Sequence, residues 1–389
     1  MRIAVPRETR QGERRVALAP DSCKKLVQAG YAIAIESGAG EAAFYTDDAY
    51  RGAGSTVETD PAAMLGSADI VLRVNAPASG AAGRDEVQWM RPRTILLGSL
   101  MPLRNLEVVR ALAARRITAF STDAVPRTTR AQAMDTLSSM ANITGYKGVL
   151  MAATELGKYF PMFMTAAGTV FPARVFVIGA AVAGLQAIAT ARRLGAHVIG
   201  TDVRPEVKEQ IESLGAKYVG VELKESASAG GGYARELSEA DKGRQRELLA
   251  EQCAAADVVI TTALVGGLIA PKLVTAAMVR RMGPGSIIVD LGADGGGNCE
   301  LSRLGESVVE NGVRIIAPLN LPAAMPTHAS LLFSRNLTAF IQTFTRNKSF
   351  MLDLSDDIQK ASIITHEGDI LHSRTREALQ GAGQSVARN

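Results

Sequence analysis

The chain has 389 residues, of which 47% are apolar and 21% charged. At roughly 150 residues per domain, this length suits two large domains, and the composition excludes a disordered polyelectrolyte. The 43 Lys and Arg residues exceed the 39 Asp and Glu residues by only 4. A nucleic-acid binder concentrates its basic residues in a patch. Because this chain has only isolated basic pairs, we expect no nucleic-acid partner.

Cysteine and histidine usage argues against a metal site. The three cysteines lie far apart without a CxxC pair, and all four histidines fall in the second half of the chain. This pattern excludes a disulfide framework and a zinc ribbon. The first residues carry charges where a signal peptide needs an apolar core, and no uncharged run suits a membrane span of about 20 apolar residues. We therefore expect a cytoplasmic chain that holds no metal.

In the first third of the chain, short apolar runs alternate with amphipathic stretches. The predicted strands are residues 3–5, 32–36, 68–74, 94–100 and 117–121, and the predicted helices are 21–28 and 106–115. Strands separated by helices predict βαβ units and a parallel sheet.

Residues 130–157 form the longest helix candidate. Small or apolar side chains recur in it every three or four residues, at Leu137, Ala141, Thr144, Gly148, Ala152 and Leu156. Such a narrow stripe suits close packing against another helix. Because this segment lies between two α/β blocks, we expect it to bridge two domains.

The second block repeats the alternation. Its predicted strands are 174–178, 197–201, 217–221, 257–262, 286–291 and 313–317, and its predicted helices are 183–194, 205–214, 241–254 and 275–282. A further helix, 331–344, could return to the first block. The polar, Gly- and Ser-rich segment 222–240 is either a surface loop or a lid in which Tyr233 closes over a ligand between glycine hinges.

A glycine-rich turn follows the strand 174–178 and opens a helix. It reads Gly179-Ala180-Ala181-Val182-Ala183-Gly184 and resembles the dinucleotide fingerprint GxGxxG, with Ala181 in place of the middle glycine. Asp202 ends the next strand, about 20 residues on, where an acidic residue binds the adenosine ribose. The pattern indicates a Rossmann-type nucleotide site and favours NAD, although Arg204 keeps NADP open. The alternative is an ordinary tight turn.

A second group of polar residues surrounds the start of the long helix. Arg127, Gln132, Asp135 and Ser138 offer donors and an acceptor that could orient an amide-bearing ligand such as nicotinamide. Equally, Thr129 to Gln132 fits a capping box, in which Gln132 only reaches back to a backbone N–H, and Asp135 and Ser138 belong to a solvated first turn.

Together these residues resemble the NAD(H)-binding component (domain I, in the alpha subunit) of proton-translocating NAD(P) transhydrogenase, within the alanine dehydrogenase/transhydrogenase family. The motifs that carry the resemblance are Arg15–Pro20, Arg130–Asp135 with Leu137–Ser139, Met164–Val170, Ala183–Ala191, Thr201–Arg204, Gly231–Ala234 and Gly296–Cys299.

The resemblance implies an α/β fold of two Rossmann-like parallel-sheet domains, linked by long helices. The NAD-binding domain, 138–327, would be inserted into the other, 1–137 plus 328–389. It also implies a homodimer that is peripheral on the inner face of the cytoplasmic membrane. Its partners would be membrane-spanning subunits and a domain that holds NADP(H), and hydride would pass directly between the two nicotinamides.

The resemblance assigns roles to individual residues. Those that meet the nicotinamide are Arg127, Gln132, Asp135 and Ser138, with Thr128 and Thr129 beside them. Those that hold the adenosine and pyrophosphate are Gly179, Ala180, Ala181, Val182, Gly184, Asp202, Val203 and Arg204. Those that close over the cofactor are Gly232, Tyr233 and Leu264. Hydride transfer between two nicotinamides needs orientation rather than an acid or base.

Two alternatives remain. In alanine dehydrogenase, the close relative, a lysine and a histidine surround the amino acid, but the matching positions here are Asn75 and Ser99. Arg15 remains, yet an arginine alone cannot accept the amine proton. The second alternative is a non-catalytic NAD(H)-binding redox sensor. It stays open because Ala181, the turn at 265–271 and the segment 292–294 depart from the family pattern near the cofactor.

Overall fold

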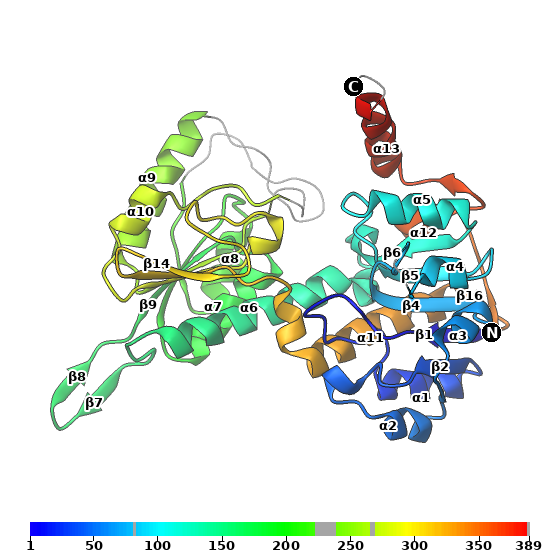
Figure 1. Cartoon of the computed structure of the whole chain (residues 1–389). Coiled ribbons are helices and arrows are strands. Elements are labelled where there is room, and N and C mark those ends of the chain that lie inside the picture. The colour runs from blue at the N-terminus through cyan, green and yellow to red at the C-terminus, as the bar shows by residue number, and fades with distance from the viewer. Residues whose placement is uncertain (81–82, 222–238, 265–268, 387–389) are drawn as a thin grey trace. The chain divides into compact units, whose positions relative to one another are not determined.

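A computed structural model describes residues 1–80, 83–221, 239–264 and 269–386 (Figure 1). The chain divides into two compact units. Unit 1 comprises Met1–Met140 and Met325–Asn389, and unit 2 comprises Ala141–Ala324. Unit 2 is therefore inserted into the sequence of unit 1. Within the described ranges, no helix is long and apolar enough to cross a membrane.

Unit 1 is built on a sheet whose strand order is β19-β18-β6-β5-β4-β1-β2-β3. Its strands are β1 (Arg2–Val5), β2 (Ala32–Glu36), β3 (Thr56–Glu58), β4 (Ile70–Asn75), β5 (Ile95–Ser99), β6 (Thr118–Ser121), β18 (Ile363–His366) and β19 (Asp369–Ile370). Strands β1 to β6 run parallel, whereas β18 and β19 are antiparallel additions. The parallel part has the doubly wound order 3-2-1-4-5-6, which reverses direction between β1 and β4.

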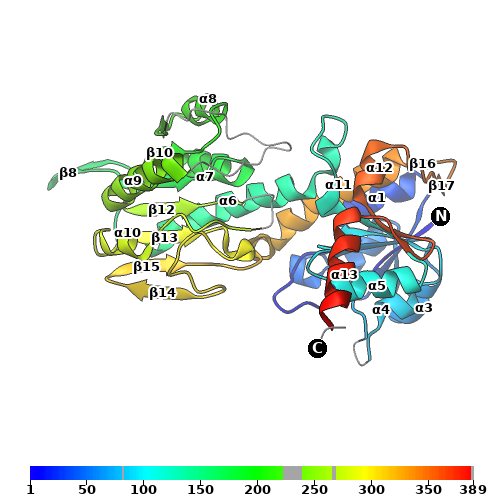
Figure 2. The ribbon, with the colours of Figure 1, turned by 90° about the horizontal axis from the view of Figure 1, so that it is seen from above.

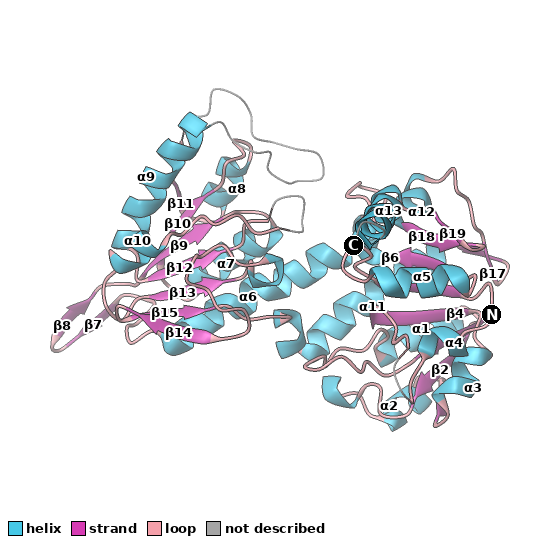
Figure 3. Cartoon of the chain, turned by 45° about the horizontal axis from the view of Figure 1, so that its top comes forward, coloured by secondary structure: helices cyan, strands magenta, loops and turns pink. Residues whose placement is uncertain are grey.

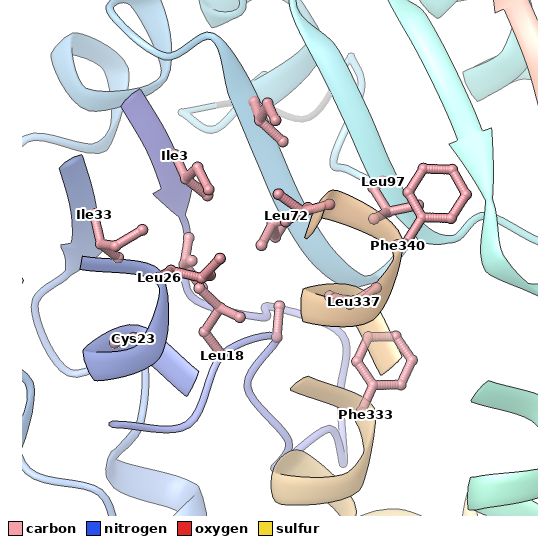
Figure 4. Close-up of a cluster of buried hydrophobic side chains, with 14 of the residues drawn as sticks. Ile3, Leu18, Cys23, Leu26, Ile33, Leu72, Leu97, Phe333, Leu337 and Phe340 are labelled. Atoms are coloured by element: carbon pink, nitrogen blue, oxygen red, sulfur yellow. The ribbon is translucent and has the colours of Figure 1, made fainter. Parts of the chain in front are cut away.

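Helices cover both faces of this sheet. They are α1 (Pro20–Gln28), α2 (Asp47–Gly52), α3 (Pro61–Gly66), α4 (Glu86–Trp89), α5 (Leu106–Ala114), α11 (Pro326–Thr343), α12 (Asp357–Ser362) and α13 (Ser373–Val386). A small hairpin joins β16 (Thr345–Arg346) to β17 (Ser349–Phe350). Helices α1 and α11 bury Leu26, Leu337 and Phe340 against Ile3 and Leu72 of the sheet (Figure 4). Helices α3, α4 and α5 pack on the opposite face.

Unit 2 has a second sheet, in the order β11-β10-β9-β12-β13-β15-β14 (Figure 3). Its strands are β9 (Arg174–Ile178), β10 (His197–Thr201), β11 (Lys217–Tyr218), β12 (Val258–Thr261), β13 (Ile287–Asp290), β14 (Ser307–Glu310) and β15 (Val313–Ile316). All neighbours are parallel except the edge strand β14. Its six parallel strands repeat the 3-2-1-4-5-6 order, so both units are Rossmann-like, as the sequence predicts.

The helices of unit 2 also form two layers (Figure 2). They are α6 (Thr136–Glu155), which begins in unit 1, α7 (Val182–Arg193), α8 (Val207–Ser213), α9 (Glu239–Ala255) and α10 (Ala276–Arg280). In β9, Val175 and Val177 face a core shared with α6, α7 and α8, whereas Phe176 and Ile178 face the core shared with α9 and α10. This burial on both faces explains why β9 is a continuous apolar run.

The long helix α6 differs from its prediction at its start. A 3-10 turn, Gln132–Met134, precedes it, and the helix begins at Thr136 rather than at residue 130. Asp135 lies between the 3-10 turn and α6 and caps the helix: its Oδ1 accepts the N–H of Ser138 at 2.8 Å, which is an N-cap interaction. No side chain caps the 3-10 turn, so the capping-box interpretation of Gln132 is wrong.

The small-residue stripe of α6 packs mainly against the sheet of unit 2, whereas the sequence predicted packing against another helix. Gly145, which the predicted stripe did not include, makes the contact with α7: a Cβ there would lie 2.1 Å from the carbonyl oxygen of Ala183 in the first turn of that helix. A Cβ at Gly148 would lie 2.8 Å from Leu291, just after β13. Ala152 and Leu156 join the sheet core of unit 2. Gly148, Ala152 and Leu156 of the stripe therefore pack α6 on the sheet of unit 2, and Gly145 beside them brings it close to the first turn of α7.

The structure also contains elements that the sequence patterns did not indicate. The hairpin of β7 (Phe163–Thr165) and β8 (Gly168–Val170) is exposed along both strands. Helix α11 begins at Pro326, five residues before the predicted 331–344, with the proline in its first turn. Proline is favoured there because the missing N–H has no helical partner.

Candidate functional site

The turn between β9 and α7 has the backbone geometry of a phosphate-binding fingerprint. Gly179 has a φ of +90°, and a Cβ there would lie 2.8 Å from Oγ1 of Thr262. A Cβ at Gly184 would lie 1.9 Å from the carbonyl oxygen of Gly179. Both positions therefore require glycine, the first for conformation and contact and the second for helix–strand packing.

The first turn of α7 suits an anion. Ala181 precedes the helix with a φ of −76°, and no side chain caps the helix there. The replacement of the fingerprint's middle glycine by Ala181 is therefore unstrained. Ala180 is buried, and Ala181 and Val182 are half-buried. The first amides of a helix have no helical partners and carry partial positive charge, so they can hold a pyrophosphate.

Asp202 lies beside this turn, directly after β10. Its Oδ2 accepts the N–H of Ala180 at 2.8 Å, which joins the expected ribose-binding carboxylate to the fingerprint turn. Its Oδ1 accepts the backbone N–H and the Nε–H of Arg204, both at 2.9 Å. A further bond, from Nη2 of Arg204 to Oδ2, also measures 2.9 Å. Asp202 thus stands where the fingerprint predicts, but paired with a cation.

The pairing with Arg204 changes the charge at this position. Both side chains are less than a tenth exposed, and the hydrogen bonds with Asp202 raise the pKa of Arg204. The hydroxyl of Tyr218 donates to the carbonyl oxygen of Asp202 at 3.3 Å, while Val203 between the pair is half-buried. A ligand hydroxyl that binds Asp202 has to share a carboxylate whose oxygens already accept several protein hydrogen bonds.

Two residues that the sequence patterns did not single out brace the carboxyl edge of the same sheet. Asn298 accepts from the N–H of Ala263 at 3.1 Å and donates to the carbonyls of Ala263 and Pro271, both at 2.9 Å. Asp290 is fully buried, and its oxygens accept five hydrogen bonds from Thr261, Gly292, Asn298, Cys299 and Ser302. In the sequence, this turn was marked only by the motif Gly296–Cys299 and by the neighbouring segment 292–294, without a role for Asn298 or Asp290.

The polar group at the start of α6 is partly assembled in unit 1. Ser138 donates to Asp135 through both its N–H and its hydroxyl, and Nε of Arg127 lies 4.0 Å from Oδ2 of Asp135. The side chain of Gln132 is exposed and makes no hydrogen bond to the described residues. Thr128 and Thr129 are exposed as well. The structure therefore joins three of the four predicted residues.

Buried anchors hold this loop in place. Ala131 and Met134 are buried in the core of unit 1, and Asn336 of α11 donates to the carbonyl of Ala133 at 2.8 Å. Arg130 forms ion pairs with Asp356 and Asp357. Gln132 is thus an exposed amide on a rigid turn. Of the residues predicted to close over the cofactor, Leu264 is half-buried, and Gly232 and Tyr233 lie outside the described residues.

Two family models together match most of the chain. The model of the alanine dehydrogenase/PNT N-terminal domain matches residues 4–144, and that of the C-terminal domain matches residues 148–373. The chain belongs to the alanine dehydrogenase/PNT family.

Individual relatives cover the chain almost completely. The first part of NAD(P) transhydrogenase subunit alpha from Rhodospirillum rubrum is 45% identical over 387 residues, which are 98% of this chain and 100% of the relative. The crystal structure of a transhydrogenase from Sinorhizobium meliloti has a TM-score of 0.86 at 41% identity and covers 95% of this chain and 100% of that one. An L-alanine dehydrogenase structure has a TM-score of 0.82 at 25% identity, with coverages of 98% and 99%.

Asn75 and Ser99 lie at the carboxyl edge of the unit 1 sheet, as the last residues of β4 and β5. Nδ2 of Asn75 donates to Glu8 at 3.2 Å and to Glu13 at 3.0 Å. The hydroxyl of Ser99 donates to Asp123 at 3.2 Å. Neither an amide nor a hydroxyl held in this way takes up a proton near neutral pH. The two positions that would carry the lysine and histidine therefore serve as hydrogen-bond donors to carboxylates.

Arg15 is engaged at the same edge. Its Nε and Nη2 donate to the two oxygens of Glu13 at 2.8 and 2.6 Å. Burial by itself raises the pKa of Glu13, but the hydrogen bonds and charge of Arg15, together with Asn75, outweigh it and lower that pKa to about 2. Glu13 is therefore ionised at neutral pH and cannot act as a general base with a useful proton affinity.

Proposed function

We propose that this chain is the NAD(H)-binding component of a proton-translocating NAD(P) transhydrogenase. In this proposal it exchanges hydride directly between NAD(H), whose adenosine half binds within residues 138–327, and NADP(H) held by a partner subunit. The observation that carries the proposal is the Gly179–Gly184 turn with its uncapped helix, in a chain 45% identical along its whole length to a transhydrogenase subunit.

The nucleotide's adenosine half would bind at the edge of the unit 2 sheet. The α7 amides after Ala181 would hold the pyrophosphate, and the glycines at 179 and 184 let the backbone approach it. Asp202 would accept from a ribose hydroxyl, and Arg204, released from one of its bonds to Asp202, would lie against the adenosine. A carboxylate at this position repels a 2′-phosphate, which supports NAD(H) over NADP(H).

The nicotinamide would be oriented by the turn that begins α6. Gln132 offers a carboxamide with both a donor and an acceptor, and Asp135 and Ser138 form a rigid pair beside it. Arg127 adds a cation, and Leu264, Gly232 and Tyr233 would close the site. Nicotinamide carries the hydride on its own ring carbon. The protein therefore supplies position and exclusion of water, and no proton moves to or from a side chain.

The exposed hairpin supports the proposal of a homodimer. Met164 and Phe171 are 82% and 80% exposed, and Met162 is 56% exposed. Monomeric proteins rarely expose contiguous apolar patches of this kind, and a second copy of the chain is the partner that the resemblance implies. We expect the double substitution Met164→Glu/Phe171→Glu to give monomers in light scattering without altering NADH binding. If the double variant remains dimeric, the hairpin is not the dimer interface.

The remaining partners follow from the relatives' names. A subunit alpha requires other subunits, which we propose to be membrane-spanning proteins and an NADP(H)-binding domain. They would hold this chain at the inner face of the cytoplasmic membrane.

A stopped-flow experiment tests the hydride transfer. The chain is mixed with the NADP(H)-binding domain of a working transhydrogenase, NADPH and an NAD⁺ analogue of shifted absorbance. We expect rapid reduction of the analogue that requires both proteins. If NADH binds but no reduction occurs, the redox-sensor function is favoured. If alanine and NAD⁺ yield NADH with this chain alone, it is an alanine dehydrogenase, and the Asn75 and Ser99 argument is wrong.

A further inference from the structure

A hollow of about 640 Å³ lies in unit 1 on the side of the sheet where β1 and β5 begin. Its walls come from segments far apart in the sequence, residues 1, 69, 91–95 and 348–350. Three lining side chains are cations, Arg91, Arg93 and Lys348, and one is an anion, Asp69. This is the opposite edge of the sheet from Asn75, which ends β4, so the hollow is separate from the residues proposed to bind the nucleotide.

The residues that line the hollow carry more positive than negative charge. Asp69 pairs with Arg91 and also accepts the N–H of Arg2 at 2.7 Å. Arg93 and Lys348 have no acidic partner in the part of the chain that the structure describes. Two exposed cations therefore face the hollow in excess of its single carboxylate.

The backbone beneath these two cations favours glycine. Arg91 to Thr94 form a turn closed by the bond from Thr94 N–H to the Arg91 carbonyl at 3.2 Å, with Pro92 second and Arg93, at φ +70°, third. This is a type II turn, whose third residue is usually glycine or asparagine. Lys348, at φ +60°, follows Asn347, at φ +50°, in the two-residue turn of the β16–β17 hairpin. Glycine is preferred at that position too.

A third cation, Arg116, also has a positive φ and lies beside Arg93. Arg116 has a φ of +56° and ends α5 in a Schellman motif, in which its N–H bonds to Ala113 and that of Ile117 bonds to Leu112. Glycine is the usual residue there. The carbonyl of Arg116 accepts the N–H of Arg93 at 2.9 Å, so the two turns are joined. An arginine or lysine at each of these glycine-favoured positions costs stability, so the three cations are candidates for a function that the fold itself does not require.

The walls of the hollow are rigid. Phe350 packs against Phe120 at 5.6 Å and against Phe340 at 6.4 Å between ring centroids. Thr94 is buried. The end of the Lys348 side chain lies over Gly30, where a Cβ would come within 3.0 Å of its Cε and 3.5 Å of its Nζ. The cations are thus presented from fixed turns, which reduces the entropy lost when they bind a ligand.

We propose that this hollow, which we call the basic hollow, binds a phosphoryl group, either of a free phosphate compound or of an anionic lipid headgroup. Arg93 and Lys348 would contact its oxygens, since guanidinium and ammonium groups are the side chains that bind phosphate. Arg116 would increase the positive electrostatic potential at the hollow. This inference does not depend on the proposed hydride transfer.

The test uses the full chain and the double substitution Arg93→Gly/Lys348→Gly. The control is Lys24→Gln/Lys208→Gln, which removes the same charge from exposed helical positions outside the hollow. One arm titrates inorganic pyrophosphate calorimetrically. The other measures cosedimentation with phosphatidylcholine vesicles with and without phosphatidylglycerol. Any phosphate binding at α7 is common to all three proteins, so the difference between them isolates the basic hollow.

We expect the wild type and the control to bind at least tenfold more tightly than the glycine variant in one arm. Binding of pyrophosphate identifies a free phosphate ligand, and binding of anionic vesicles alone identifies a headgroup. Because glycine relieves both turns, we expect the glycine variant to unfold at the same or a higher temperature than the wild type. Equal binding by all three proteins overturns the proposal. A lower unfolding temperature of the glycine variant also overturns it, because the cations would then serve the fold.

Discussion

The substitution Gly184→Ala is expected to disrupt unit 2 at the nucleotide-type turn. The new methyl carbon would lie 1.9 Å from the carbonyl oxygen of Gly179, whereas ordinary contact begins near 3.4 Å. Helix α7 would have to withdraw by about 1.5 Å at its first turn, and the obstacle is backbone that cannot rotate away. Overpacking of this kind costs about 1–3 kcal/mol and occasionally more, and we expect a value near the upper end.

The same displacement should weaken nucleotide binding. The amides of α7 would no longer reach the pyrophosphate, and a loss of about 1.4 kcal/mol is already tenfold in Kd. NADH fluorescence titration and urea unfolding measure the two effects. The control is Gly52→Ala in α2, where no atom lies within 4 Å of the new methyl, so stability should hold or rise by up to about 1 kcal/mol. A Gly184→Ala protein with wild-type Kd and unfolding midpoint would refute the packing argument.

Three further substitutions address the site and its surroundings. Gln132→Asn should slow hydride transfer strongly with little change in NADH affinity, because the shorter amide stays on the same turn; equal loss of both in stopped-flow and titration would make Gln132 a general binding residue. Asp202→Ala should narrow the preference for NADH over NADPH in paired titrations, and an unchanged ratio would remove Asp202 from the adenosine site. The pKa of Glu13 is lowered in the folded chain to about 2 from an ordinary value of 4.5, so its stabilisation is present above pH 4.5 and lost as pH falls towards 2. Glu13→Gln should therefore cost stability at pH 6, on the order of 3 kcal/mol at most, and the difference from wild type in urea unfolding should shrink between pH 4.5 and 2; a constant difference would contradict the ion pair with Arg15.

The sequence predicted the buried parallel strands well. The bounds of β2, β9 and β10 are those expected from their apolar runs, because strands covered on both faces leave little freedom in sequence. The exposed hairpin β7–β8 and the edge strand β14 escaped prediction. The residues of β7 and β8 are exposed and those of β14 are exposed or half-buried, so burial imposes no apolar pattern on them.

The sequence predicted the residues of the candidate site only where their role depends on neighbours close in the sequence. Gly179 and Gly184 act within one turn, and their spacing reveals them. The pairing of Asp202 with Arg204 also lies within three residues, but whether the two side chains meet depends on the strand end that holds them. Asn298 bonds to Ala263, 35 positions away, and no sequence spacing indicates such a contact. The start of α6 was misplaced because Asp135, rather than Thr129, provides the cap.

The two units use glycine differently at positions with constrained backbone. In unit 2, glycine stands at 179 and 184 because backbone contact and a φ of +90° exclude other residues, and Ala181 is tolerated because its φ is negative. In unit 1, the reverse occurs at Arg93 and Lys348, where left-handed turns favour glycine but carry cations. A fold alone would be stabilised by glycine at both cations. Their presence around one hollow therefore indicates selection for a charge at that place, for which an anionic ligand is the direct physical explanation.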